Sequence, residues 1–112
     1  RGITDMDTAY GNLDREFVDY FLKKRARLGI RCIDLTPDTE GGRRSKADDA
    51  KYIRTTKFLP AEYNFKGDIS IYDNKVGIFS YDRESPVAVL IEDEAIAGMM
   101  KTLFDFMAKN AK

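Results

Sequence analysis

The chain has 112 residues and a mass of 12.8 kDa, which is the size of one ordinary domain. Hydrophobic residues make up 43% of it and aromatic residues 12%, which excludes an intrinsically disordered chain. Its 19 basic and 19 acidic side chains cancel, so a strongly basic nucleic-acid binder is excluded as well.

Two residue types restrict the chemistry that the chain can perform. It has no histidine, so no mechanism that needs a histidine acid, base, nucleophile or metal ligand can use its side chains. Cys32 is its single cysteine, which excludes an internal disulfide and a cysteine-rich zinc site. We therefore expect no metal and no cofactor, and we expect Cys32 to be a buried structural thiol rather than a nucleophile.

No stretch of the sequence approaches the roughly 20 uninterrupted apolar residues of a membrane span, and no charged-then-apolar leader opens it. We expect a cytoplasmic protein with no membrane partner. The sequence begins at Arg1 rather than at a methionine, so we also expect it to be a piece of a longer protein. Residues 1–112 are interpreted as one domain.

The first third of the chain predicts a strand, a turn and a helix. Residues 1–4 are expected to end a strand, and the acidic run at 5–8 to form a turn. Asn12 is a good helix N-cap, and Gly29 stands where a left-handed C-cap is wanted. Between them, apolar residues expected to face the core recur at helical spacing: Leu13, Phe17, Phe21 and Leu28.

A strand and a loop are predicted next. Residues 30–36 have apolar side chains of both parities, which is typical of a strand covered on both faces. The order of helix, glycine and buried strand favours a parallel sheet. Residues 38–46 contain no apolar side chain and include Gly41 and Gly42, so they are interpreted as a flexible loop.

A short helix, a strand and a hairpin are expected after the loop. Ser45 and Asp48 resemble a capping box that opens the helix. Residues 55–59 predict the strand. The apolar period then changes to two on either side of Asp73 and Asn74, which indicates two antiparallel strands joined by a turn.

The end of the chain predicts one more strand and one more helix. Residues 87–91 form a very apolar run that is expected to be a central strand. The acidic residues 92–94 favour the start of a helix, and Asn110 is expected to end it. The fold class is therefore α/β: a single domain whose mixed sheet is parallel early, forms antiparallel hairpins late and is flanked by helices.

The last helix carries more apolar residues than one core face needs. Its expected core stripe is formed by Met99, Leu103, Phe106 and Met107. Met100 and Phe104 stand beside that stripe at positions i and i+4, and we expect them at the interface of a homodimer. The alternative is a single wide core that covers both stripes.

Arg43, Arg44 and Ser45 follow two glycines ahead of a predicted helix. Free backbone N–H groups at a helix start, aided by arginines, can hold phosphate or carboxylate. These three residues are therefore an anion-binding candidate, and the alternative is a solvated loop.

The segment FKGDISIYDNKVGIF, residues 65–79, resembles the active-site hairpin of the phospholipase D-like fold. That family carries His-x-Lys-x-x-x-x-Asp there. With Asp73 on the family's aspartate, Lys66 stands at the histidine position and Asp68 at the lysine position, so the catalytic motif is absent. The chain looks like the phospholipase D-like regulatory domain of TrmB-like transcriptional regulators. The similarity also runs through the phrases FVDYFLKKRARLGIRCIDLTPD, IRTTKFLP and EAIAGMMKTLFDFM.

This resemblance implies a non-catalytic domain that senses a small-molecule effector, often a sugar in that family, and forms a homodimer. It implies DNA contact only through an N-terminal winged helix that this sequence does not contain. Lys66, Asp68, Asp73 and Ser80 are expected to line what is left of the ancestral pocket as ligand-binding residues. Two alternatives stay open: a dimerisation module that senses nothing, and a diverged phosphodiesterase or nuclease half-domain, against which the missing histidine counts.

Overall fold

The computed structural model describes residues 1–12, 15–82 and 84–112. The strands found there are β1 (Gly2–Thr4), β2 (Cys32–Pro37), β3 (Arg54–Leu59), β4 (Gly67–Tyr72), β5 (Lys75–Ser80) and β6 (Ala88–Glu92). The helices found there are α1 (Met6–Asn12), α2 (Arg15–Arg27), α3 (Glu40–Ala47) and α4 (Glu94–Asn110).

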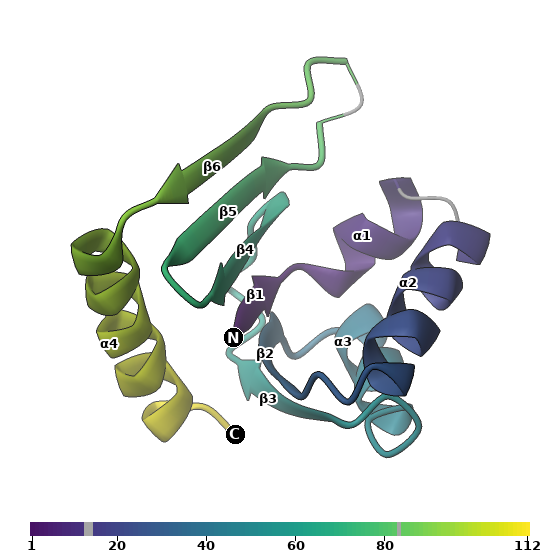
Figure 1. The fold of residues 1–112 in the computed structure, drawn as a ribbon. Coiled ribbons are helices and arrows are strands. Elements are labelled where there is room, and N and C mark those ends of the chain that lie inside the picture. Colours follow the sequence, from purple (N-terminus) through teal and green to yellow (C-terminus); the bar gives the residue numbers. More distant parts are fainter. Residues whose placement is uncertain (13–14, 83) are drawn as a thin grey trace.

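The strands of the described residues form one six-stranded sheet in the order β3-β2-β1-β4-β5-β6 (Figure 1). β1 pairs in parallel with β2, and β2 pairs in parallel with β3. The other three pairs, β1 with β4, β4 with β5 and β5 with β6, are antiparallel. The predicted α/β fold, with parallel pairing early and antiparallel hairpins late, is confirmed.

One face of the sheet is covered by α4, and the other helices lie on the opposite side (Figure 1). Strand register shows which side chains share the α4 face, because directly paired residues point the same way. Ile3 pairs with both Leu35 and Ile69, and Ile71 pairs with Val76. These apolar residues pack with Ala97 and Phe104 of α4 into the hydrophobic core.

The opposite face of β2 and β3 is polar although it is buried. Asp34, Thr36, Arg54 and Thr56 alternate with the apolar residues of the same strands and are all almost inaccessible to solvent. α3 packs against β3 on this side and contacts α1. The sheet therefore separates an apolar layer under α4 from a polar layer under α3.

Several local predictions are confirmed. Gly29 has a φ of 73°, and the N–H groups of Gly29 and Ile30 donate to the carbonyls of Ala26 and Arg25, which ends α2 in a Schellman motif. The hairpin between β4 and β5 turns at Asp73, whose φ is 51°. Asp93 caps α4 by accepting a hydrogen bond from Ile96 N at 2.8 Å, and Asn110 is the last residue of that helix.

The turn expected at residues 5–8 is wrong, because α1 begins at Met6. Asp5 Oδ1 accepts a hydrogen bond from Thr8 N at 3.2 Å, so this residue acts as a helix cap. Turn formers and N-caps are the same residue types, and the sequence pattern does not separate them. Asn12 belongs to α1 rather than opening the next helix. Its predicted side-chain cap and the predicted core position Leu13 lie outside the described part of the structure.

The flexible loop predicted at residues 38–46 is also wrong, since α3 occupies most of it. Thr39 caps this helix by accepting a hydrogen bond from Gly42 N at 3.2 Å. Gly41 and Gly42 allow α3 to pack closely against its neighbours. A Cβ at Gly41 would collide with Asp7, and a Cβ at Gly42 would collide with the Pro37 carbonyl. The capping box predicted for Ser45 and Asp48 is wrong, because both stand at the end of α3.

Two predictions about burial fail as well. β6 lies at the edge of the sheet rather than at its centre, where Leu90 is 62% exposed and Val89 43% exposed. The side chains of Phe17 and Phe21 on α2, and of Leu28 just after it, were expected in the core but are more than half exposed. Apolar periodicity identifies the face of a helix or strand that is stabilised by burial, but it does not show which part of the protein, if any, buries that face.

Candidate functional site

A cluster of polar side chains lies where the end of β1 meets the middle of β2 and the start of β4. Thr4 of β1 is directly paired with Asp68 of β4, and β2 contributes Asp34 from the other side. Thr4 Oγ1 lies 2.7 Å from Asp68 Oδ1 and 3.3 Å from Asp34 Oδ1. Ser70 Oγ donates a further hydrogen bond to Asp68 Oδ2 at 3.0 Å. One threonine hydroxyl thus connects two carboxyl groups.

Gly2 makes room for this cluster. A Cβ at Gly2 would lie 2.9 Å from Asp34 Oδ1, which is closer than real side chains approach. Gly2 and Asp34 are paired residues of parallel strands, so their side chains would point the same way. Because residue 2 has no side chain, the Asp34 carboxyl group can lie directly against the β1 backbone without a clash.

Burial decides the protonation of the cluster. Asp34 is 5% exposed, and burial raises the pKa of its carboxyl group to about 7, although the nearby Arg54 guanidinium acts in the opposite direction. Burial also raises the pKa of Asp68, while its hydrogen bonds from Thr4 and Ser70 lower it. The two carboxyl groups therefore hold a proton more readily than exposed aspartates do.

The Thr4 hydroxyl has one proton to donate and lone pairs that accept, so it can donate fully to only one of the two carboxyl groups at a time. When Asp34 is protonated, its carboxyl O–H can donate to Thr4 Oγ1 while Thr4 donates to ionised Asp68. In this arrangement the 3.3 Å contact between Thr4 and Asp34 and the 2.7 Å contact between Thr4 and Asp68 are both hydrogen bonds. The negative charge then stands on Asp68, which is the more accessible of the two carboxyl groups. The three side chains thus form a short hydrogen-bonded chain across the three strands.

Tyr81 and Asp5 complete the surroundings of the cluster. Burial raises the pKa of the Tyr81 phenol well above its usual range, and the negative charges of Asp68, Asp34 and Asp5 act in the same direction. Its backbone N–H donates to the Lys66 carbonyl at 3.0 Å, and the Asp5 N–H donates to the Gly67 carbonyl at 3.3 Å. Tyr81 therefore contributes a neutral phenol.

The four residues predicted to line a pocket are not brought together. Asp68 joins the cluster, but Ser80 is opposite Gly67 and so points to the other face of the sheet. Asp73 is at the far end of the hairpin, five residues from Asp68, which corresponds to roughly 17 Å of extended strand. Lys66 is exposed. The hairpin forms as expected, but its strand geometry separates these side chains.

The anion site predicted at Arg43, Arg44 and Ser45 is wrong, because these residues lie inside α3 and the start of that helix is filled from within the chain. Gly41 N donates to Asp7 Oδ1 at 2.6 Å. Arg43 pairs with Asp38 at 2.9 Å, and the Arg44 guanidinium lies over the Tyr10 ring at 4.7 Å.

Ser45 is fully buried, and its carbonyl accepts a hydrogen bond from the Arg54 guanidinium. At the start of α3, the Gly41 N–H therefore holds the Asp7 carboxylate, and the Gly42 N–H donates to Thr39 Oγ1.

An ion pair is buried close to the cluster. Arg54 Nε lies 2.9 Å from Asp49 Oδ1, and both side chains are mostly or fully buried. Asp49 also accepts hydrogen bonds from Thr56 N and Thr56 Oγ1, each at 2.7 Å. The pair connects the end of α3 to β3.

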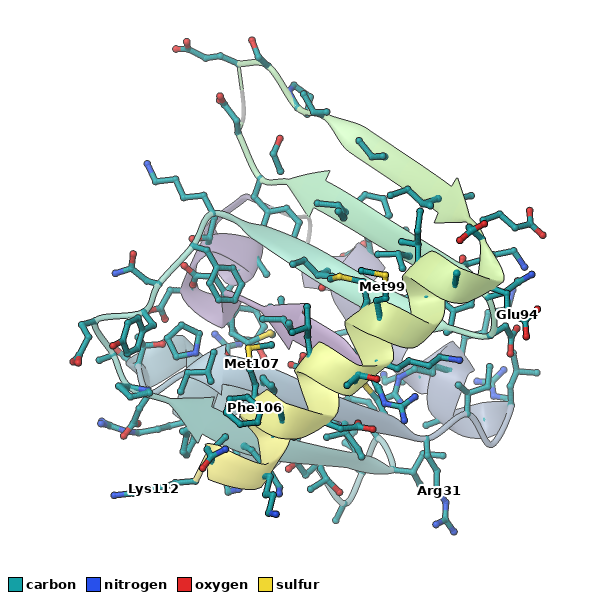
Figure 2. All side chains as sticks on the ribbon, turned by 90° about the vertical axis from the view of Figure 1, so that its left-hand side faces the viewer. Arg31, Glu94, Met99, Phe106, Met107 and Lys112 are labelled. Atoms are coloured by element: carbon teal, nitrogen blue, oxygen red, sulfur yellow. The ribbon has the colours of Figure 1, made fainter. Side chains whose placement is uncertain are left out.

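The structure reverses the predicted burial of the two apolar stripes of α4: most of the expected core stripe is exposed, and the expected interface pair faces the core. Phe104, expected at a dimer interface, is 1% exposed and belongs to the core, and Met100 packs against that core. Three residues expected in the core are exposed instead: Met99 at 66%, Leu103 at 56% and Phe106 at 70%. Figure 2 faces this helix and labels Met99 and Phe106. Met107 packs against the core as expected.

Sequence reasoning missed Thr4 and Asp34. The one available signal was a charged residue within the apolar run CIDL, because an aspartate in a buried strand needs a partner. Cys32 is half-buried, and burial raises the pKa of its thiol, which makes it a poor nucleophile. Among the described residues, no three acidic or cysteine side chains are grouped so that they could hold a metal ion.

Comparison with known proteins identifies no relative of this chain. A scan against models of known families matches none of them, and searches of curated proteins and of solved structures give no match either. No helix in residues 1–12, 15–82 and 84–112 has the length and apolar character that crossing a membrane requires.

Proposed function

We propose that this chain is a non-catalytic domain that forms a homodimer and senses a small-molecule effector in a TrmB-like transcriptional regulator. Its net charge of zero provides no field that would attract DNA, so DNA contact would be made by a region outside these 112 residues. A cytoplasmic location is part of the same proposal.

The apolar outer face of α4 is the observation that carries this proposal. Ile96, Met99, Leu103 and Phe106 stand on that face, and each is at least 40% exposed. Contiguous apolar surface on a protein marks an interaction site more often than scattered single residues do. A second copy that covered this face would remove it from water, which favours a dimer.

The missing catalytic residues support a non-catalytic role. The chain has no histidine, and the residues at the family's motif positions, Lys66, Asp68 and Asp73, do not converge. Nucleophilic catalysis requires the nucleophile and its partner within hydrogen-bond reach of each other. A phosphodiesterase therefore has no support in this chain's own geometry.

The proposed effector site is the polar cluster formed by Thr4, Asp34, Asp68 and Ser70. The Asp68 carboxyl oxygens accept hydrogen bonds from Thr4 and Ser70 and have further lone pairs that suit the hydroxyl groups of a sugar. β4 and β5 also expose Tyr72 and Phe79 on the same face of the sheet as Asp68, and an aromatic ring can stack on an apolar sugar face. The proposed effector is thus a neutral, hydroxyl-rich small molecule.

Two measurements test the proposal. Sedimentation velocity at increasing concentration should show a dimer by the high micromolar range. A thermal-shift screen of neutral sugars, with sugar phosphates as the charged comparison, should raise the melting temperature of the wild type but not of Asp68→Asn. A ligand at 100 times its dissociation constant stabilises by about 2.7 kcal/mol, which is readily measured. A chain that stays monomeric and gains no stability from any compound would overturn the proposed function.

A further inference from the structure

We propose that two copies of this chain pair through α4 in antiparallel orientation, with Ile96, Met99, Leu103 and Phe106 as the buried seam. This inference rests on the proposed function and names the occupant of the apolar face as a second copy of this chain. It also specifies the orientation and register of the contact.

The spacing of the exposed residues is that of a helix-pairing seam. Residues 96, 99, 103 and 106 follow each other by three, four and three positions, which matches the a and d positions of a heptad. The residues that face the sheet fall elsewhere on the helix: Ala97, Met100, Phe104 and Met107. One helix thus has a core face and a separate, regularly spaced outer face.

The charges at the two ends of α4 select the antiparallel orientation. The helix is preceded by Glu92 and Asp93 and begins with Glu94, whereas Lys109 and Lys112 stand at its other end. In an antiparallel pair, each acidic end lies beside the partner's basic end, and the two helix dipoles oppose each other. A parallel pair would bring like charges together at both ends.

Symmetry then sets the register. In an isologous dimer the same patch meets itself, so residues equidistant from the centre of the seam face each other. The centre of the stretch 96–106 is residue 101, which places Ile96 against Phe106 of the second copy and Met99 against its Leu103. Lys101 itself lies on another flank, where its Nζ donates to the Asp73 carbonyl.

Other exposed apolar residues on the same side of the sheet extend this surface. Ile78 and Val89 are paired across β5 and β6, and both share the parity of Val76 and Ile91, which face α4. They stand on the edge half of the sheet beyond the cover of α4.

The experiment compares charge substitutions at matched exposure. Met99→Lys combined with Leu103→Lys should weaken dimerisation by at least about 100-fold in sedimentation, because buried apolar anchors carry most of an interface's free energy. Phe21→Lys on α2 is the control, since Phe21 and Leu103 are both 56% exposed. Circular dichroism and urea unfolding confirm that each variant is folded.

Single-cysteine variants in a Cys32→Ser background test the orientation. When Ala95→Cys and Lys109→Cys are mixed, mild oxidation should join them in a mixed disulfide. Lys109→Cys alone should not crosslink, because its antiparallel equivalents are more than about 20 Å apart along the helix axis. Homodimeric crosslinking of Lys109→Cys would instead indicate a parallel pair and overturn the inference.

These outcomes separate the inference from the function on which it rests. A dimer that persists in the Met99→Lys, Leu103→Lys variant would place the interface elsewhere, which refutes the α4 pairing and leaves a dimerising domain. A wild type that remains monomeric at high micromolar concentration would refute the α4 pairing and the homodimer of the proposed function, and the thermal-shift screen would then decide whether effector sensing stands.

Discussion

The two faces of the sheet are filled in opposite ways. Under α4 the contacts are apolar, with Phe104 packed into a cluster that includes Ile71 and Val76. Under α3 they are polar, with Asp34 and Arg54 both buried. One sheet thus carries two kinds of interior, separated by the alternation of side chains along its strands.

This difference shows how each half is stabilised. Apolar burial is non-directional and roughly proportional to area, so the α4 side tolerates exchanges that conserve volume. Buried polar groups depend on particular partners, and removing one leaves the other without compensation. The α4 side should respond to changes in size, and the α3 side to changes in charge and hydrogen bonding.

The largest effect is expected from Phe104→Ala. Loss of a fully buried phenylalanine leaves a cavity and should lower the free energy of unfolding by about 3–5 kcal/mol in urea titrations. Phe106→Ala on the same helix should change it by less than about 1 kcal/mol in dilute protein, because this ring is already in water. Equal losses in the two variants would contradict the assignment of the two faces of α4.

A pH dependence is expected from Asp34. Its pKa is about 7 in the folded chain against an ordinary value of 3.8, so the folded state binds more protons than the unfolded state between those values. The contribution of Asp34 to stability is therefore fully present below about pH 4 and is lost as the pH rises through about 7. Each pKa unit is worth about 1.4 kcal/mol, which makes the loss roughly 4 kcal/mol.

Asp34→Asn provides the comparison for this pH dependence. The difference in unfolding free energy between wild type and variant, measured from pH 4 to pH 8, should fall as the pH rises. A difference that stays constant over that range would mean that Asp34 does not hold its proton in the folded state.

Removal of the buried ion pair should have a slightly smaller effect. Asp49→Ala deprives Arg54 and both Thr56 donors of their acceptor and should lower the unfolding free energy by about 3 kcal/mol. The matched control is Asp38→Ala, which breaks the exposed pair with Arg43 and should cost less than about 1 kcal/mol. Chemical denaturation of the two variants side by side decides whether the polar layer depends on this pair.

The smallest effects distinguish two helical glycines. Gly41→Ala should destabilise by about 1–3 kcal/mol, because the added methyl group collides with Asp7 where α1 meets α3. Gly98→Ala in α4 should stabilise by up to about 1 kcal/mol, because nothing lies within 4 Å of the added atom and alanine favours a helix. Thermal unfolding of both variants should therefore shift in opposite directions.

The sequence by itself determined the features that depend on near neighbours. The positive φ at Gly29, the turn at Asp73 and the cap at Asp93 each follow from one residue and its immediate surroundings. The alternating hairpin and the α/β class follow from periodicity over short windows. Local preferences of this kind act in the same way whatever the rest of the chain does.

Only the tertiary structure decided which surfaces are covered. The residues around Gly41 lack apolar side chains, and they form a helix because Asp7 and Thr39 supply its start with acceptors. Both stripes of α4 are apolar, and the placement of that helix on the sheet, not its composition, buries Phe104 and exposes Phe106. Thr4, Asp34 and Asp68 come from three strands, and their hydrogen bonds exist because strand pairing brings together residues that are 30 and 64 positions apart in the sequence.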